Sequence, residues 1–415
     1  MKSNYKPIGQ YIQRVEHRNR DLKVTRLLGL SMTKEFRETT SNIVGTDMSV
    51  YRIMSKYQFA CDFMSPIRVN KLPVVLKLDN EPNLVSPAYP VFEIKDKNEL
   101  DPEYLMMWFR RTEFDRYATF KCDAAIRGGY EWTELCETLI PVPTITRQRE
   151  IVKEYNIIQK RIALNQQLIQ KLEETAQAIY KQWFVEFEFP DENGKPYKSN
   201  GGEMLYNDDT EMEIPKGWHI VMFEEIIDKI IDNRGKTPPI SENGEKLLFE
   251  TFLINNNQAF PSIGISNKNK FVSNEIYNKW FRAGHPEYLD ILFGTVGNGI
   301  PSWTLTPKKV NFCIAQNIIG LRLKKDVSPF YVKSFFFTDS FKSQFSGRVI
   351  DTAQPSIRVS DIKTIKLIKP IETIMAKYHK LVLPIYEYTE IKVRENQMLS
   401  SKKDILLARI STIEI

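Results

Sequence analysis

Three charged residues in the first hundred positions have the types and spacing of a metal-dependent nuclease site. Asp79 precedes the segment FEIKDK, in which Glu93 and Lys95 alternate along a strand-like run. A nuclease site of this kind needs two acids that converge on Mg²⁺. The alternative is an amphipathic strand with its charges on the wet face. We favour the strand, because a later segment that repeats this one has Gly320 and Arg322 in place of Glu93 and Lys95.

Two glycine-bearing segments have the composition of nucleotide-binding loops. The segment FGTVGNG, residues 293–299, has the spacing G-x-x-G-x-G, which is the reverse of the dinucleotide fingerprint, and no helix with a suitably placed acidic residue follows it. The segment RGKTPP begins at Arg234 and contains Gly-Lys-Thr, but a phosphate-binding loop needs a glycine at the position of Ile230. Both segments therefore predict turns.

The histidines and cysteines form no recognisable catalytic or metal-binding pattern. The histidines are His17, His219, His285 and His379, and no Ser or Cys stands in an activating context. The cysteines are Cys61, Cys122, Cys136 and Cys313, with no CxxC pair and no histidine at ligand spacing. We therefore expect reduced core thiols, no metal site, and a chain that is not an enzyme by itself.

The composition is that of a globular protein with several domains. The chain has 415 residues, of which 42% are hydrophobic, enough for two or three cores. Lys and Arg number 58 against 52 Asp and Glu, so the small basic excess permits nucleic-acid binding without requiring it. The sequence has neither a signal-peptide pattern nor an uncharged apolar run of about 18 residues, and we expect a cytoplasmic protein.

The most regular part of the chain is a long helical segment in its middle. Apolar or near-apolar residues recur there at steps of four and three: Ile151, Tyr155, Ile158, Ile162, Asn165, Ile169, Leu172, Ala176, Ile179 and Trp183. A period of 3.5 residues is typical of a coiled coil, and residues 147–184 as one helix would be about 57 Å long. Asn165 is the polar position of this seam, where a buried amide can fix the register.

A second helical segment repeats this seam at an offset of 231 residues. The matching positions are Val382, Tyr386, Thr389, Val393, Asn396, Ser400, Lys403, Leu407, Ile410 and Glu414. Asparagine falls on asparagine, so Asn165 is predicted to pair with or oppose Asn396. The second seam is the poorer one because its middle and its end are polar, and Pro384 should kink or begin the helix.

The segments that precede the two helices also repeat. Residues 86–143 align without a gap with residues 313–370. Each copy has a strand-like run, a helix with Pro and Tyr near its start, a polar loop, a proline and a long helix, in that order. The predicted fold class is therefore α+β, with two similar globular domains separated by two long antiparallel coiled-coil helices and an internal pseudo-twofold repeat.

The order of these elements predicts a division of the chain. It consists of a first globular domain at 1–143, a central long helix at 144–187, a linker at 188–215, a second globular domain at 216–369 and a C-terminal helix at 370–415. Two separated modules suit a ligand with two sites along one axis. Duplex DNA is such a ligand, since dimeric DNA readers meet half-sites at multiples of about 34 Å.

Two polar loops at matching places in the copies are candidates for reading bases. In the first loop, AAIRGGYEW, Arg127 could contact guanine through both of its terminal nitrogens, and Gly128 and Gly129 permit close approach. Tyr130 or Trp132 could stack on bases or position the loop. The alternative is an ordinary turn with a solvated arginine.

The second loop, TAQPSIRVS, differs in its chemistry. It offers Gln354, which suits adenine, together with Ser356 and Arg358. Weaker DNA-binding candidates elsewhere are Arg52, Lys56, Lys71, Arg234, Lys236, Asn298 and Gln316. For any one of these weaker candidates, a solvated surface residue is the better interpretation.

Several segments around the central helix resemble one protein family. The strings LEETAQAIYKQWFVEFEFP, GKPYKSNGGEM and EIPKGW resemble the central region of the specificity subunits of type I restriction-modification enzymes. The opening YKPIGQYIQRVEHRNRDLKVTRLLGLS and the loop RGGYEW resemble the first target-recognition domain of some members. The resemblance covers the whole predicted architecture.

The resemblance implies a subunit that reads a bipartite DNA target and has no catalytic activity. Each of two target-recognition domains would read one half-site, with the helices as a spacer. Two modification subunits would bind S-adenosylmethionine and methylate adenine, and restriction/translocase subunits would use ATP and Mg²⁺; no cofactor is expected on this chain.

The resemblance also assigns residues of the central helix to contacts with the modification subunits. These are Glu173, Glu174, Tyr180, Trp183 and Phe184, although Trp183 and Phe184 could instead close the local core. The second helix has no counterpart of the WFVEF ending. An alternative of another class is a non-catalytic adaptor, whose coiled coil binds protein partners and whose domains bind peptides.

Overall fold

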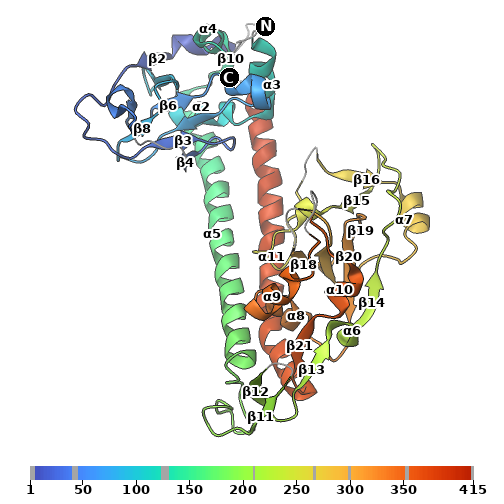
Figure 1. Ribbon diagram of the computed structural model, residues 1–415. Helices are drawn as coiled ribbons and strands as arrows, with labels where there is room; N and C mark the ends of the chain where they lie inside the picture. The colour runs from blue at the N-terminus through green and yellow to red at the C-terminus, as the bar shows by residue number, and fades with distance from the viewer. Residues whose placement is uncertain are drawn as a thin grey trace. The chain divides into compact units, whose positions relative to one another are not determined.

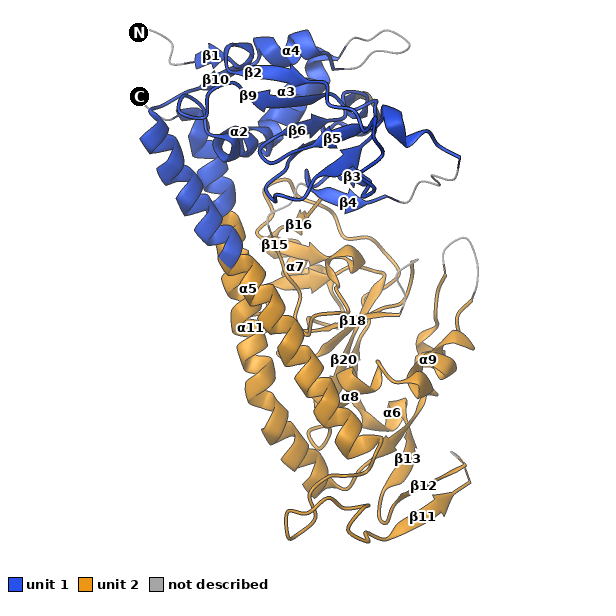
Figure 2. Ribbon diagram, turned by 90° about the vertical axis from the view of Figure 1, so that its left-hand side faces the viewer, with its two compact units in different colours: residues 1–160, 402–415 blue, residues 161–401 orange. Residues whose placement is uncertain are grey.

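The computed structural model describes residues 5–39, 45–122, 130–208, 211–264, 268–297, 301–350 and 355–412. The chain divides into two units, which are coloured separately in Figure 2. Unit 1 consists of Met1–Lys160 and Lys402–Ile415, and unit 2 consists of Arg161–Ser401. Each unit combines small β-sheets with helices, so the predicted α+β class is confirmed.

The central sheet of unit 1 has four antiparallel strands in the order β2–β9–β6–β7. They are β2 (Ile12–Val15), β9 (Val91–Ile94), β6 (Phe59–Cys61) and β7 (Val74–Leu76). Phe59 and Phe92 stack across neighbouring strands with ring centroids 4.9 Å apart, and Phe109 of helix α2 (Pro102–Phe109) packs edge-on against Phe59 at 5.9 Å. Helix α2 begins where it does because Asp101 accepts hydrogen bonds from two backbone N–H groups of the first turn.

Smaller elements complete unit 1. Its other strands form the pairs β1 (Tyr5–Pro7) with β10 (Leu139–Pro141), β3 (Leu28–Leu30) with β4 (Phe36–Glu38), and β5 (Arg52–Met54) with β8 (Asn83–Val85). Its other helices are α1 (Ser65–Val69), α3 (Thr112–Lys121) and α4 (Trp132–Glu137), with 3-10 turns η1 (Ile8–Gln10) and η2 (Met48–Val50). A buried ion pair of 2.7 Å between Lys34 Nζ and Asp115 ties the β3–β4 turn to α3.

Unit 2 contains a sheet with the same plan. Its four antiparallel strands are β14 (Ile227–Ile231), β20 (Ile318–Leu323), β17 (Ile291–Gly294) and β18 (Ser302–Leu305), in that order. A three-stranded sheet contains β16 (Lys270–Val272), β15 (Lys246–Phe249) and β19 (Phe312–Ile314). Two further pairs are β13 (His219–Met222) with β21 (Lys366–Lys369), and β11 (Met204–Asn207) with β12 (Met212–Pro215). The short helices are α6 (Phe223–Ile226), α7 (Asn274–Trp280), α8 (Pro329–Phe335), α9 (Asp339–Ser346) and α10 (Val359–Lys363), with the 3-10 turn η3 (Thr251–Leu253).

The two units repeat one topology. The sheet order β2–β9–β6–β7 in unit 1 corresponds strand for strand to β14–β20–β17–β18 in unit 2. Helices α2, α3 and α4 begin 227 residues before α8, α9 and α10, respectively. The same tertiary hydrogen bond recurs at this offset, since the Tyr104 hydroxyl donates to the carbonyl of Pro141 at 3.1 Å and the Tyr331 hydroxyl donates to the carbonyl of Ile368. The internal repeat predicted from the sequence is therefore present in the backbone.

Two long helices contribute to both units. They are α5 (Ile145–Phe184) and α11 (Glu372–Arg409), and the 3-10 turn η4 (Ile410–Thr412) follows α11. In unit 2 the two helices run side by side (Figure 1) and are antiparallel, because Asn165 meets Asn396 while Trp183 lies against Tyr378 at 6.0 Å. Pro384 lies inside α11, so it does not begin the helix.

The predicted seam residues face inward. Every described seam position of the two helices is buried or half-buried. In unit 1, Ile151 and Tyr155 belong to the same core as Leu407 and Ile410. The last predicted position of the second seam, Glu414, lies outside the described residues.

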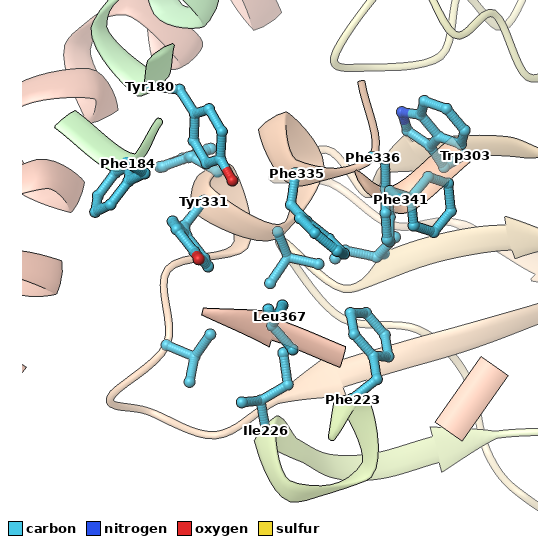
Figure 3. Close-up of a cluster of buried hydrophobic side chains, with 14 of the residues drawn as sticks. Tyr180, Phe184, Phe223, Ile226, Trp303, Tyr331, Phe335, Phe336, Phe341 and Leu367 are labelled. Carbon is cyan, nitrogen blue, oxygen red and sulfur yellow. The ribbon is translucent and has the colours of Figure 1, made fainter. Parts of the chain in front are cut away.

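The end of α5 is part of the core of unit 2. Figure 3 shows Tyr180 and Phe184 directed at Tyr331 of α8, and their ring centroids lie 5.4 and 4.7 Å from that of Tyr331. The segment expected to be a linker, 188–215, also packs onto this unit. Its Phe189 is buried and stacks on Trp218 at 5.0 Å, and strands β11 and β12 form a hairpin. The composition of this segment predicts a linker without fixed contacts, but its apolar residues attach it to unit 2.

Candidate nucleic-acid interface

The nuclease-like residues of the sequence do not form a site. Asp79 accepts a hydrogen bond from Lys77 Nζ at 2.6 Å, and Glu93 accepts one from Gln58 at 3.0 Å. Lys95 Nζ donates instead to the backbone carbonyls of residues 9 and 10. Among the described residues, no group of three or more His, Cys, Asp and Glu side chains could hold a metal ion. The amphipathic-strand interpretation accounts for these contacts.

The two predicted base-reading loops end at equivalent places in the two units. In unit 1, the backbone N–H of Tyr130 donates to the carbonyl of Phe63, just after β6, at 2.8 Å. In unit 2, the N–H of Ile357 donates to the carbonyl of Thr295, just after β17, at 3.0 Å. Residues 130 and 357 differ by the repeat offset of 227. The same backbone bond therefore anchors two loops of different sequence, and we call these two places the loop anchors.

At the first loop anchor, Tyr130 is a packing residue. Its side chain is only 2% exposed, its hydroxyl shares a hydrogen bond of 3.0 Å with Thr138, and its ring packs edge-on against Phe63. Burial raises the pKa of this hydroxyl above its usual value. The stacking role predicted for Tyr130 is therefore wrong, and the positioning role fits. Arg127, Gly128 and Gly129 lie outside the described residues.

A shallow cleft lies beside this anchor. It is lined by Arg14, Phe63, Tyr130, Glu131, Trp132 and Thr133. Arg14 lies over the half-buried Trp132 ring, with its guanidinium carbon 4.9 Å from the ring centroid. The sequence prediction found Trp132 and missed Arg14, although Arg14 opens the basic run RVEHRNR. The cleft thus presents a cation, a carboxylate and three aromatic rings beside the predicted loop.

At the second loop anchor, the described residues are polar and partly exposed. Ser356 forms β-bridges with Val296 and Ile350, so its backbone is held in place. Arg358 is exposed and precedes α10. Gln354 lies outside the described residues, as does Asn298.

The weaker DNA-binding candidates are of two kinds, side chains held in ion pairs and side chains exposed to solvent. Arg52 is bound to Glu16 at 2.7 Å, and Arg234 binds Asp232 through two nitrogens at 2.8 and 2.6 Å. The bound Arg234 lowers the pKa of Asp232. The exposed candidates are Lys56, Lys71, Lys236 and Gln316. To contact DNA, Arg52 and Arg234 would each have to leave its carboxylate partner and bind a phosphate or a base instead.

Most of the predicted partner contacts on α5 are wrong. Tyr180, Trp183 and Phe184 are each less than a tenth exposed, because unit 2 of the same chain covers them. Glu173 accepts hydrogen bonds from Lys333 Nζ at 2.5 Å and from the N–H of Ala259 at 2.6 Å, so it holds α5 to the sheet-bearing part of unit 2. Glu174 is exposed and remains a candidate.

The two seam asparagines meet. Asn165 Nδ2 donates to Asn396 Oδ1 at 2.9 Å, and Asn396 Nδ2 donates to the carbonyl of Ile162 at 3.4 Å. An ion pair of 2.6 Å between Arg161 and Glu395 lies beside them, and together with the ion pair that Lys392 makes with the same carboxylate it lowers the pKa of Glu395 to about 2. The predicted pairing is therefore present, and the amide requires one alignment of the helices.

Two repeated α+β units, an antiparallel helix pair and equivalent loop anchors define a protein with two similar modules. No helix of the described residues is long and apolar enough to cross a membrane. The candidate contacts are polar and aromatic groups around loops, which fit recognition better than catalysis.

Comparisons with known proteins identify this class further. No protein-family model matches the chain. The chain is 24% identical over 329 residues to the MjaIX specificity subunit of a type I restriction enzyme from Methanocaldococcus jannaschii, covering 76% of this chain and 69% of that protein. It is 25% identical over 391 residues to the HindI specificity subunit from Haemophilus influenzae, covering 81% and 82%.

Among solved structures, the S subunit of a type I restriction-modification system from M. genitalium has a similar fold. The TM-score is 0.52 at 14% identity, and the alignment covers 99% of this chain and 96% of that one. The resemblance drawn from the sequence is thereby confirmed. The chain thus resembles the specificity subunits of type I restriction enzymes in sequence, and it resembles the S subunit from M. genitalium in fold.

Proposed function

We propose that the chain reads a bipartite DNA target, with one half-site for each target-recognition domain. The domains would be residues 1–143 and 216–369, joined through helices at 144–187 and 370–415 and the segment 188–215. The main support is the pair of loop anchors, because the same backbone bond at residues 130 and 357 carries loops of unlike sequence. Two domains that read different half-sites would need loops at equivalent positions with different side chains, which is the arrangement found here.

The base-reading residues remain those predicted from the two loops. Arg127 would contact guanine in the first half-site, with Arg14 and Trp132 beside the loop for backbone or stacking contacts. Gln354 would contact adenine in the second half-site, with Ser356 and Arg358 at the loop anchor.

The proposed protein partners are two modification subunits and the restriction/translocase subunits. In unit 2, α11 carries exposed apolar side chains at steps of seven, three and seven: Leu381, Tyr388, Ile391 and Met398, which are 43–61% exposed. Such a stripe lies outside the seam and suits a partner helix. The modification subunits would bring S-adenosylmethionine and methylate adenine in the cytoplasm, and the restriction subunits would use ATP and Mg²⁺. This chain would hold no cofactor.

The test is sequence-selective binding by the chain together with its modification subunits. Duplexes bound from a randomised pool should share two short conserved blocks at a fixed separation, and affinity should fall steeply with salt. The adaptor alternative predicts no conserved block and no salt-dependent DNA binding. Cleavage of DNA by the purified chain with Mg²⁺ alone would contradict the non-catalytic assignment.

A further inference from the structure

We infer that a polar cleft of unit 2, outside the two predicted loops, reads a base pair of the second half-site, with Asn257 selecting adenine. The inference rests on the proposed function and adds a specificity-determining residue to it. The cleft has a volume of about 410 Å³ and includes Phe252, Asn255, Asn257, Val296, Gly297 and Ser302 in its lining.

The cleft is joined directly to the second loop anchor. The N–H of Gly297 donates to the carbonyl of Pro355 at 2.9 Å, and Val296 forms a β-bridge with Ser356. On its other side, Thr251 accepts a hydrogen bond from Asn317, the neighbour of the exposed Gln316. A base read by the second loop would therefore lie next to the cleft.

The chemistry of the lining favours a base edge over a phosphate. None of the described residues that line the cleft is charged; they supply amides, hydroxyl groups and apolar groups. Phosphate contacts draw mainly on cationic side chains and backbone N–H groups, whereas an asparagine amide can bond adenine N6 and N7 together. Phe252 is 51% exposed, and an apolar side chain at this position suits the methyl group of the paired thymine.

The three consecutive asparagines have different tasks. Asn256 fixes the segment, since its Nδ2 donates to the carbonyl of Pro301 at 2.9 Å and its Oδ1 accepts from the N–H of Trp303 at 3.0 Å. Asn255 Oδ1 accepts from the N–H of Asn257 at 3.0 Å and so shapes the turn. Asn257 is exposed on a segment that its neighbours hold in place. A fixed backbone with an exposed amide is the arrangement that base selection needs.

The experiment compares Asn257→Ala and Asn257→Asp with the wild-type chain, each in complex with the modification subunits. The second half-site is first defined with the wild-type complex, and each of its positions is then replaced by the other three base pairs. We expect each variant to lose about 10-fold or more of the discrimination at one A·T position, with the first half-site unaffected. The Asp variant keeps the size of the side chain and removes the amide donor. Asn311→Ala, an exposed asparagine of unit 2 outside the cleft lining, should change nothing.

The outcomes separate this inference from the function on which it rests. Unchanged discrimination by both Asn257 variants, in a wild-type background that is sequence-specific, would overturn the inference alone. An equal loss of affinity on every duplex would also overturn it, because the residue would then contact the DNA backbone. A wild-type complex that prefers no sequence would overturn the proposed function as well.

Discussion

The buried ion pair between Lys333 of α8 and Glu173 of α5 gives a prediction whose size follows from its surroundings. The Lys333 side chain is 1% exposed and that of Glu173 is 11% exposed, and the charged atoms lie 2.5 Å apart. Lys333 Nζ also lies 5.1 Å from the centre of the Phe337 ring and 5.3 Å from that of Tyr386. We expect Lys333→Met to destabilise unit 2, because the Glu173 carboxylate would then be buried without a counter-charge.

Removal of one partner of a buried ion pair costs about 3–5 kcal/mol. Glu173 keeps its hydrogen bond from the N–H of Ala259, so we expect a value near the lower limit, about 3 kcal/mol. Adding Glu173→Gln removes the stranded charge and retains an acceptor for that N–H. The double variant should therefore lose only about 1 kcal/mol, because exchange of both partners of such a pair is often close to neutral.

Hydrogen exchange of backbone amides in α8 is a suitable assay, because it reports the local free energy of opening in a chain whose units need not unfold together. Lys342→Met on the neighbouring α9, whose ion pair with Asp339 is solvent-exposed, is the matched control and should leave protection unchanged. Two results would refute this prediction. One is a double variant that is no more stable than Lys333→Met; the other is a Lys333→Met variant whose loss of amide protection in α8 is no larger than that of the control.

Four further predictions concern the helix pair and the first loop. Replacing both Asn165 and Asn396 by Leu should raise the midpoint of thermal unfolding but allow a second alignment of the two helices. Cysteines engineered into the two helices would report the second alignment as additional cross-linked products. If the variant gave only the cross-links of the parent, the asparagines would not set the register. Removing one heptad from each seam should change the spacing of the selected half-sites and leave their sequences intact, as pool sequencing would show. Arg127→Ala should relax base preference in one half-site only, by about 1–3 kcal/mol, and a uniform loss across duplexes would demote it to a phosphate contact. The ion pairs with Arg161 and Lys392 together lower the pKa of Glu395 below its usual 4.5, to about 2, so their stabilisation is complete above pH 4.5 and is lost as pH falls toward 2. Arg161→Met removes the larger of the two contributions, so the stabilities of wild type and variant should converge as pH falls through that window. Acid-titration curves that stay parallel would refute this prediction.

The helix pair and the repeat could be predicted from the sequence because both leave periodic signals. A seam buried along its whole length must recur every 3.5 residues, and the asparagine that interrupts it falls at the same phase in each helix. The loop anchors were predictable in position for a similar reason, since the ungapped repeat carries residue 130 onto 357.

Contacts between residues distant in sequence could not be predicted in this way. The aromatic end of α5 has the composition of an interface, and the sequence does not say that Tyr331 and Tyr378 of the same chain cover it. Glu173 finds its partner 160 residues away. Asn257 was missed because it belongs to no periodic element, although the run of three asparagines was a visible signal of an amide-rich surface.

The asparagine contact between the helices has a consequence for how such proteins can diversify. The same residue type comes from each helix, one amide donating and the other accepting, so the contact is indifferent to which half of the chain supplies which partner. A chimaera that joins the first half of one chain to the second half of a relative would keep this contact if both parents have the asparagine. In this respect the contact does not require that both halves of the helix pair come from the same parent.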